Sequence, residues 1–267
     1  MSSTRLKKRL VPKLLIKRRR VGATTRPLLV TTRHYREALD IGDPVSQAKI
    51  YEAQLADELA VLNIDPMVSG DDDTLLVLIE RLATETFMPL TVGGGVRKLE
   101  DFARLLERGA DKVCINTAAF LQPQLISEAA SRFGTQCVVV SMDFRTDPGG
   151  SAMIYLRGAS ERLELGVVES AVRAARAGAG EILLTDADRD GTGEGLNCAV
   201  GRAVADAVPI PIILSGGCGR AEHFVEGFQQ GGAEAVAAGT FFCFRDQNPM
   251  QTRAHIRNAG VPIRMET

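Results

Sequence analysis

The chain has 267 residues, 45% of them hydrophobic and 24% charged, with 26 glycines, no tryptophan and a formal net charge of −1. Its length is close to the roughly 250 residues of one (β/α)8 barrel, and its glycines suit tight strand-to-helix turns better than an aromatic-rich sandwich. No segment approaches the ~20 consecutive apolar residues that cross a bilayer, and the N-terminus lacks the apolar core of a signal peptide. We therefore expect a soluble α/β protein with a single domain, residues 1–267, and no membrane partner.

The first part of the chain is strongly basic. Nine of the first twenty residues are Lys or Arg, from Arg5 to Arg20, and we interpret residues 1–8 as a basic extension. A basic arm is able to bind nucleic acid or an anionic ligand. No aromatic residues are interleaved with these charges, so we favour a solvated segment and expect no nucleic-acid partner.

Eight short apolar runs follow one another along the chain. They are too continuous for strands with one wet face and are typical of parallel strands buried on both sides. Segments between them, such as Leu99–Arg108 and Val167–Ala177, carry apolar residues at helical spacing, which predicts a closed (β/α)8 barrel. The predicted strands are Val11–Ile16, Leu59–Ile64, Met88–Val92, Lys112–Ile115, Cys137–Met142, Glu181–Thr185, Ile210–Leu214 and Ala235–Ala238.

An internal repeat favours a closed barrel over an open sheet. Aligning the chain with itself at an offset of 123 residues, the separation of Gly93 and Gly216, also pairs Gly109-Ala110 with Gly232-Ala233 and Thr117 with Thr240. Two copies of a four-unit block give a barrel with twofold pseudosymmetry directly.

The repeat contains two Gly-rich turns, each between a predicted strand and a predicted helix. Glycine permits positive φ and lets backbone N–H groups approach an anion. We predict two phosphate sites on opposite sides of the barrel mouth. Their residues are Gly93, Gly94 and Gly95 in the first turn and Ser215, Gly216 and Gly217 in the second.

Polar residues after other strands extend the predicted substrate site. Asn116 and Thr117 follow the fourth strand, and Gly239 and Thr240 follow the eighth, where a phosphate is often bound in barrels of this kind. Thr185, Asp190 and Gly191 lie at or after the end of the sixth strand. Taken alone, the turn with Asp190 and Gly191 is also consistent with a plain hydrophilic connection.

The cysteines and histidines do not form ligand patterns. Five cysteines lie singly along the chain, without CxxC spacing, and the three histidines, His34, His223 and His255, are far apart. We expect no disulfide framework, no metal and no cofactor, and a reducing cytoplasmic location fits best.

Several motifs resemble the cyclase family of imidazole glycerol phosphate synthase from about Lys8 to the C-terminus. They include Ile41-Gly42-Asp43-Pro44, Thr91-Val92-Gly93-Gly94-Gly95, Ile115-Asn116-Thr117-Ala118-Ala119 and Asp188-Arg189-Asp190-Gly191-Thr192. The resemblance implies a barrel that takes ammonia from a bound glutaminase, adds it to a bis-phosphorylated ribulosyl aminoimidazole substrate and closes the imidazole ring. It also implies that 21–39 forms a mobile loop over the active site.

The same resemblance implies two catalytic aspartates, at the ends of the first and fifth strands. Asp143 matches the fifth-strand position, but Leu15, in Leu14-Leu15-Ile16-Lys17, replaces the first. Leucine cannot exchange a proton, and losing one half of an acid/base pair costs on the order of 10²–10⁴ in rate. Asn63 stands where the family usually has a further aspartate, so the mouth departs from the family pattern.

The opposite end of the barrel keeps the family pattern. The resemblance places a gate for the ammonia channel there, and its residue types are present as Arg9, Glu58, Lys112 and Glu181. Asp111 matches a position that docks the glutaminase. A salt-bridge plug that merely closes the floor is the alternative interpretation.

An intact gate with an altered mouth resembles the cyclase-like branch that serves acetamidino-sugar modification in bacterial surface polysaccharides. This implies delivery of ammonia to a separate amidotransferase acting on a nucleotide-linked sugar. Two alternatives stay open: an authentic histidine-pathway cyclase, and a non-catalytic barrel scaffold. The isomerase of the preceding histidine step shares the half-repeat but binds no glutaminase, so the gate residues argue against it.

Overall fold

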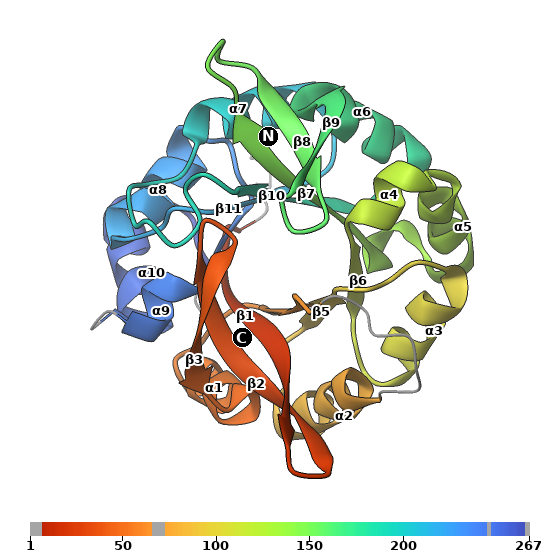
Figure 1. Cartoon of the computed structure of the whole chain (residues 1–267). Coiled ribbons are helices and arrows are strands. Elements are labelled where there is room, and N and C mark those ends of the chain that lie inside the picture. Colours follow the sequence, from red (N-terminus) through yellow and green to blue (C-terminus); the bar gives the residue numbers. More distant parts are fainter. Residues whose placement is uncertain (1–6, 66–72, 245–246, 265–267) are drawn as a thin grey trace.

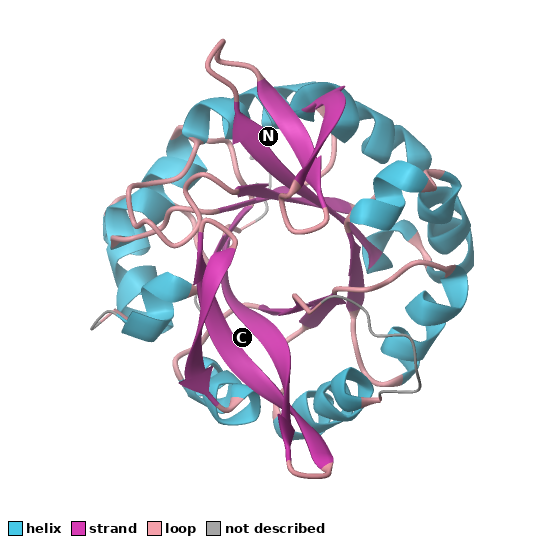
Figure 2. Ribbon diagram, viewed as in Figure 1, coloured by secondary structure: helices cyan, strands magenta, loops and turns pink. Residues whose placement is uncertain are grey.

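The fold is a closed barrel of eight parallel strands surrounded by helices (Figures 1 and 2). The computed structural model describes residues 7–65, 73–244 and 247–264. In barrel order, the strands are β1 (Arg9–Val21), β4 (Leu59–Asn63), β5 (Leu90–Gly93), β6 (Lys112–Ile115), β7 (Val138–Thr146), β10 (Glu181–Asp186), β11 (Ile212–Ser215) and β12 (Ala235–Ala238). Pairing of β7 with β10 and of β12 with β1 closes the ring, which confirms the predicted (β/α)8 barrel.

The helices form the outer ring seen in Figure 1. They are α1 (Pro44–Ala53), α2 (Thr74–Glu85), α3 (Leu99–Glu107), α4 (Thr117–Leu121), α5 (Gln124–Phe133), α6 (Val167–Ala177), α7 (Cys198–Ala207), α8 (Ala221–Gln229), α9 (Thr240–Phe244) and α10 (Pro249–Asn258), with a 3₁₀ turn at Thr135–Cys137. None of the helices within the described ranges is long and apolar enough to span a bilayer.

Helix α3 shows how the sequence sets these elements. The Asp101 carboxylate accepts hydrogen bonds from the backbone N–H groups of Arg97 and Lys98, at 2.9 and 3.1 Å, and so caps the first turn. Phe102 and Leu105, three residues apart, are buried against the barrel. The capping carboxylate therefore stabilises the start of the helix, and one apolar stripe of the helix packs against the barrel.

The buried apolar residues form two clusters, one on each side of the barrel wall. The larger cluster lies between strands and helices. The smaller lines the barrel interior and consists of Val11, Ala60, Cys114, Val139, Leu183, Ile213, Ala235 and Ala237, with Leu62 packed against it. Strand β1 shows the alternation that separates them: Leu10 and Leu14 belong to the outer cluster, whereas Val11 faces the interior.

Segment 21–39, which the resemblance implied to be a mobile loop, contains regular secondary structure, while its mobility stays a prediction. The segment forms strands β2 (Thr24–Arg33) and β3 (Arg36–Gly42), which pair as an antiparallel hairpin. β2 also pairs with β1 over seven positions, from Leu15–Val30 to Val21–Thr24. This pairing extends β1 well beyond the predicted 11–16, because the backbone groups of its second half find partners in β2.

A second hairpin was not expected from the sequence. Strands β8 (Ala152–Leu156) and β9 (Glu161–Gly166) extend from β7, which itself continues to Thr146 to pair with β8. Figure 1 shows the two hairpins on opposite sides of the barrel opening. The remaining predicted strands agree with the structure to within two residues at each end.

Candidate functional site

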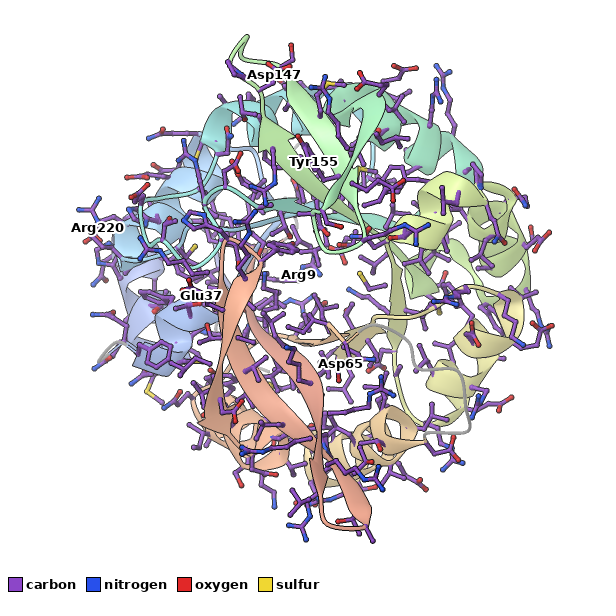
Figure 3. The ribbon with its side chains drawn as sticks, viewed as in Figure 1. Arg9, Glu37, Asp65, Asp147, Tyr155 and Arg220 are labelled. Carbon is purple, nitrogen blue, oxygen red and sulfur yellow. The ribbon has the colours of Figure 1, made fainter. Side chains whose placement is uncertain are left out.

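The four predicted gate residues form a closed ring of ion pairs at the barrel floor. Glu58 Oε1 lies 2.8 Å from Arg9 Nη1 and 2.9 Å from Lys112 Nζ. Glu181 contacts the other guanidinium nitrogen of Arg9 through Oε1, and its Oε2 lies 3.0 Å from Lys112 Nζ. In the view down the barrel, Arg9 lies inside the ring of strands (Figure 3). The structure thus brings all four predicted residues into one cluster with no net charge.

Burial and mutual attraction act against each other in this ring. Burial by itself lowers the pKa of Arg9, but Glu181 and Glu58 together hold it above its ordinary value. Burial by itself raises the pKa of Glu58, but Arg9 and Lys112 hold it below its ordinary value. Arg9 and Glu58 therefore stay charged at neutral pH.

Asp111 is exposed at the edge of the floor and does not join the ring. Its carboxylate accepts a hydrogen bond of 2.8 Å from the Leu90 backbone N–H, so it fixes the start of β5. Docking of a partner at Asp111 stays a prediction.

Above the floor ring, the apolar cluster of the barrel interior contains small side chains beside branched ones. Three alanines, Ala60, Ala235 and Ala237, lie in the interior cluster, where bulky branched residues dominate in most barrels. An apolar interior disfavours a charged ammonium ion far more than neutral ammonia.

Asp143 lies at the mouth and is 5% exposed. Tyr35 donates its hydroxyl hydrogen to Asp143 Oδ1 at 2.7 Å, and the Asn116 side-chain amide donates to Oδ2 at 2.8 Å. Burial raises the pKa of Asp143, although both donors and the charge of Lys13 act to lower it. Burial also raises the pKa of Tyr35 well above its ordinary value, so the phenol stays protonated. Asp143 is therefore the group in this cluster that is suited to exchange a proton.

A cavity of about 980 Å³ opens beside Asp143, a size suited to a small-molecule ligand. Leu15 and Asn63 both line it, so the two departures from the family pattern face the same space as Asp143. The Asn116 side-chain oxygen is buried without a hydrogen-bond partner among the described residues. A ligand with an N–H or O–H group would satisfy it.

The first Gly-rich turn lines this cavity through Gly94 and Gly95, next to Asn116 and Thr117. Gly94 has a φ of +101°, and a Cβ atom there would lie 2.0 Å from the Asn63 carbonyl oxygen. Only glycine therefore fits at this position. Gly93, the last residue of β5, is buried and lies outside the cavity lining.

The second turn lines a separate cavity of about 20 Å³. Ser215, Gly216, Gly217, Gly239 and Thr240 all contribute to it, as predicted for one site. Gly216, like Gly94, has positive φ, and its Cβ would meet the carbonyl oxygen of the last residue of the neighbouring strand, Asp186. The structure thus pairs Gly94 with Gly216, one position from the sequence alignment, because the second turn carries an extra residue before Arg220.

The β2–β3 hairpin covers this second site. Thr31 and Thr240 share a hydrogen bond of 2.7 Å between their hydroxyls, and Thr32 donates to Asp190 Oδ2 at 2.7 Å. A Cβ atom on Gly191 would lie 2.2 Å from the Thr32 carbonyl oxygen. Gly191 therefore permits close packing of the hairpin, and its contact with a substrate stays a prediction.

Thr185 lies buried at the end of β10, directly opposite Asp143 in the β7–β10 register. It therefore borders the Tyr35–Asp143 contact, and both Gly-rich turns open on the same face as this contact. The structure gathers the predicted residues at one end of the barrel and the gate residues at the other.

Two residues of the mouth were missed from the sequence. Tyr35 could not be assigned because the sequence of its segment departs from the family's, so no role carries over to its individual residues. Lys13 had a signal: it lies on β1 at an even spacing from Arg9 and Val11, so alternation places it in the barrel interior. Within the described ranges, no three His, Cys, Asp or Glu side chains come together as ligands for one metal ion.

Comparison with known proteins agrees with these features. Residues 11–247 match the family model described as "Histidine biosynthesis protein". The chain is 48% identical over 264 residues to a protein of Prochlorococcus marinus (strain MIT 9313) named "Putative imidazole glycerol phosphate synthase subunit hisF2", covering 98% of this chain and 99% of that protein. The chain therefore belongs to the histidine biosynthesis protein family, and the similarity to the Prochlorococcus protein extends along nearly its whole length.

Proposed function

We propose that this protein is a synthase subunit that receives ammonia from a glutaminase bound at the barrel floor and uses or delivers it at the mouth. The observation that carries the proposal is the closed ring of Arg9, Glu58, Lys112 and Glu181 beneath an apolar interior. A ring with no net charge excludes ions while it is closed. Docking of a partner would have to rearrange it before neutral ammonia could pass.

The acceptor is a phosphorylated small molecule that binds across the mouth between the two Gly-rich turns. Asp143, buried with a raised pKa, exchanges the proton that amidination or ring closure requires. No cofactor takes part in this proposal. We favour the acetamidino-sugar branch, with a separate amidotransferase as a further partner, because Leu15 removes the second proton-exchanging carboxylate.

An authentic histidine-pathway cyclase is the second candidate. It is supported by the name of the similar Prochlorococcus protein and by the retained Asp143. A non-catalytic scaffold is the third, and it predicts neither turnover nor glutaminase coupling.

The deciding experiment supplies ammonium salt and the bis-phosphorylated ribulosyl aminoimidazole substrate to the purified barrel, so that no glutaminase is needed. Ring closure at an enzymatic rate would establish the histidine-pathway cyclase. Substrate binding without ring closure would support the delivery function. Rescue of a histidine auxotroph gives the same separation in cells.

A second measurement tests the partner. A glutaminase subunit of the family is titrated with the barrel, and glutamine hydrolysis is followed. We expect hydrolysis to rise on complex formation, and less so with Arg9→Met. Absence of binding and of stimulation would leave the scaffold as the remaining function.

A further inference from the structure

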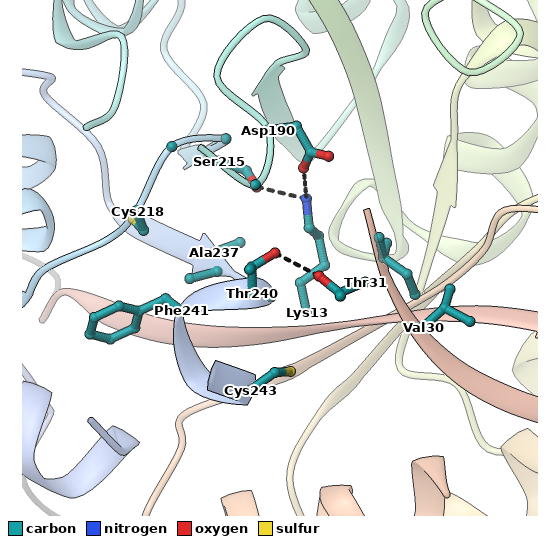
Figure 4. Close-up of a pocket in the computed structure, with 16 residues that line it drawn as sticks. Lys13, Val30, Thr31, Asp190, Ser215, Cys218, Ala237, Thr240, Phe241 and Cys243 are labelled. Atoms are coloured by element: carbon teal, nitrogen blue, oxygen red, sulfur yellow. Dashed lines mark hydrogen bonds and ion pairs between the residues drawn. The ribbon is translucent and has the colours of Figure 1, made fainter. Parts of the chain in front are cut away.

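Lys13 is a buried cation with unused hydrogen-bond donors. Its side chain points into the barrel from β1 and is 6% exposed. Nζ lies 3.0 Å from Ser215 Oγ and 4.0 Å from Asp190 Oδ1 (Figure 4). Among the described residues, Ser215 Oγ is the one acceptor within hydrogen-bond distance, whereas an ammonium group carries three donors. A buried charge so sparsely bonded is costly unless another group binds it.

The ammonium group of Lys13 lies beside the second Gly-rich turn. Lys13 lines the cavity of about 20 Å³ together with Ser215, Gly217 and Thr240. It also lines the large cavity beside Asp143, so it stands where the two meet. A cavity of this size holds about one water molecule. The Thr31–Thr240 hydrogen bond, drawn in Figure 4, closes it on the hairpin side.

The ion pair between Lys13 and Asp190 leaves the ammonium group able to bind another anion. The Asp190 carboxylate already accepts hydrogen bonds from the Thr32 hydroxyl at 2.7 Å and from the Tyr35 backbone N–H at 3.4 Å. It therefore keeps partners if the ammonium turns toward another anion. The same hydrogen bonds hold the hairpin in place above the site.

Resting on the phosphorylated ligand of the proposed function, we propose that Lys13 binds a phosphate monoester group of that ligand at the second Gly-rich turn. Its ammonium meets the phosphate oxygens beside the Ser215 hydroxyl, while the glycines let the backbone approach. The phosphate takes the place of the hairpin contact, so the Thr31–Thr240 hydrogen bond opens on binding.

The two halves of the barrel supply a comparison within the same molecule, because β1 begins the first four-strand half and β7 begins the second. Lys13 stands two residues before Leu15 on β1, and Ser141 stands two residues before Asp143 on β7. Ser141 is buried like Lys13, but it is uncharged and lies 3.4 Å from the Asn116 amide. Among the described residues, the first turn thus lacks the buried cation of the second. Phosphate therefore binds more tightly at Gly216 and Gly217 than at Gly94 and Gly95.

The test titrates the whole protein with inorganic phosphate and follows the backbone amide signals of both turns by NMR. Lys13→Met should weaken binding at Gly216 and Gly217 by about 10- to 100-fold, the loss of one charged hydrogen bond. Binding at Gly94 and Gly95 should be unchanged. Lys49→Met removes the same charge from an exposed pair on α1 and should change neither turn.

Unchanged phosphate affinity at Gly216 and Gly217 in Lys13→Met would overturn the proposal, as would an equal loss at both turns. If Lys13→Met does not fold, the proposal is tested on the wild-type protein instead. The Lys13 Cε signal, identified from its absence in Lys13→Arg, should shift with the same saturation as the Gly216 amide. A signal that does not move would reject the proposal. The test uses neither ammonia nor glutaminase, so its outcome is separate from that of the proposed function.

Discussion

At the floor of the barrel, two carboxylates each lie against two cations, whereas at the mouth Asp143 is held by a phenol and an amide, both uncharged. The pKa of Glu58 is therefore lowered, and that of Asp143 is raised. A carboxylate fixed between cations is suited to closing a passage. A buried carboxylate held by neutral donors is suited to exchanging a proton. The two ends of the barrel thus hold carboxylates of opposite character, as the proposed division into transport at the floor and chemistry at the mouth requires.

The strongest test of this division removes the proton-exchanging group. Asp143→Asn keeps the shape of the side chain and should lower ammonium-dependent turnover by about 10²–10⁴, because amides do not exchange protons in this pH range. Steady-state rates measure the effect, and Asp206→Asn, on the exposed face of α7, is the control. Full activity in Asp143→Asn would show that Asp143 does not exchange a proton in the reaction and that the barrel only conducts ammonia.

Restoring the family's second carboxylate at the mouth tests whether its loss limits the chemistry there. Leu15→Asp places a second carboxylate in the cavity with Asp143 and should raise ring closure of the histidine-pathway substrate by about 10² or more. Leu62→Asp is the matched control, since Leu62 is opposite Leu15 in the β1–β4 register and lines the same cavity. Equal gains in both variants would show that any added carboxylate suffices.

Breaking the floor ring should affect stability before it affects chemistry. Glu58→Gln leaves Arg9 and Lys112 with one carboxylate between them, and we expect a loss of about 3 kcal/mol in the free energy of unfolding. Chemical denaturation measures this loss. Glu169→Gln breaks an exposed pair with Arg173 and should change little. A Glu58→Gln protein as stable as the wild type would show that the ring is not a structural unit.

The stability difference between wild type and Glu58→Gln should depend on pH. The pKa of Glu58 is lower in the folded protein than its ordinary value of 4.5. Its stabilisation is therefore complete above about pH 4.5 and falls as the pH drops through the folded-state pKa, since the unfolded chain binds the proton first. Thermal melting between about pH 3 and pH 7 should show the two proteins converging only in acid. Convergence at neutral pH would contradict this.

The smallest expected effect concerns the phenol. Tyr35→Phe removes a donor to the ionised Asp143 and should raise the pKa of Asp143 further, by up to about one unit. A carbon-13 titration of the carboxyl group measures it. Tyr155→Phe is the control, because Tyr155 is opposite Asp143 in the β7–β8 register, yet its hydroxyl makes no hydrogen bond to Asp143 in the described structure. A lower pKa in Tyr35→Phe would mean that the phenol does not stabilise the carboxylate.

Much of the barrel could be predicted from local patterns. The runs at Lys112–Ile115 and Ala235–Ala238 match β6 and β12 at both ends, because buried parallel strands are apolar throughout and end at polar or glycine residues. The hairpin at 24–42 could not be predicted, because the family resemblance suggested a loop there and the pairing partner of β2 is the second half of β1. Lys13 could be placed in the interior by alternation, because it lies two residues after Val11 on β1.

The sequence by itself determined the eight strands and the two Gly-rich turns, since periodicity and a repeat are properties of the chain alone. The residues of the floor ring came from the resemblance to the family. The tertiary structure decided what each buried charge touches. Tyr35 and Asp143 are 108 positions apart, and Lys13 and Ser215 are 202 apart. No local pattern encodes such contacts, because they exist only once the barrel has closed and the hairpin has folded over its mouth.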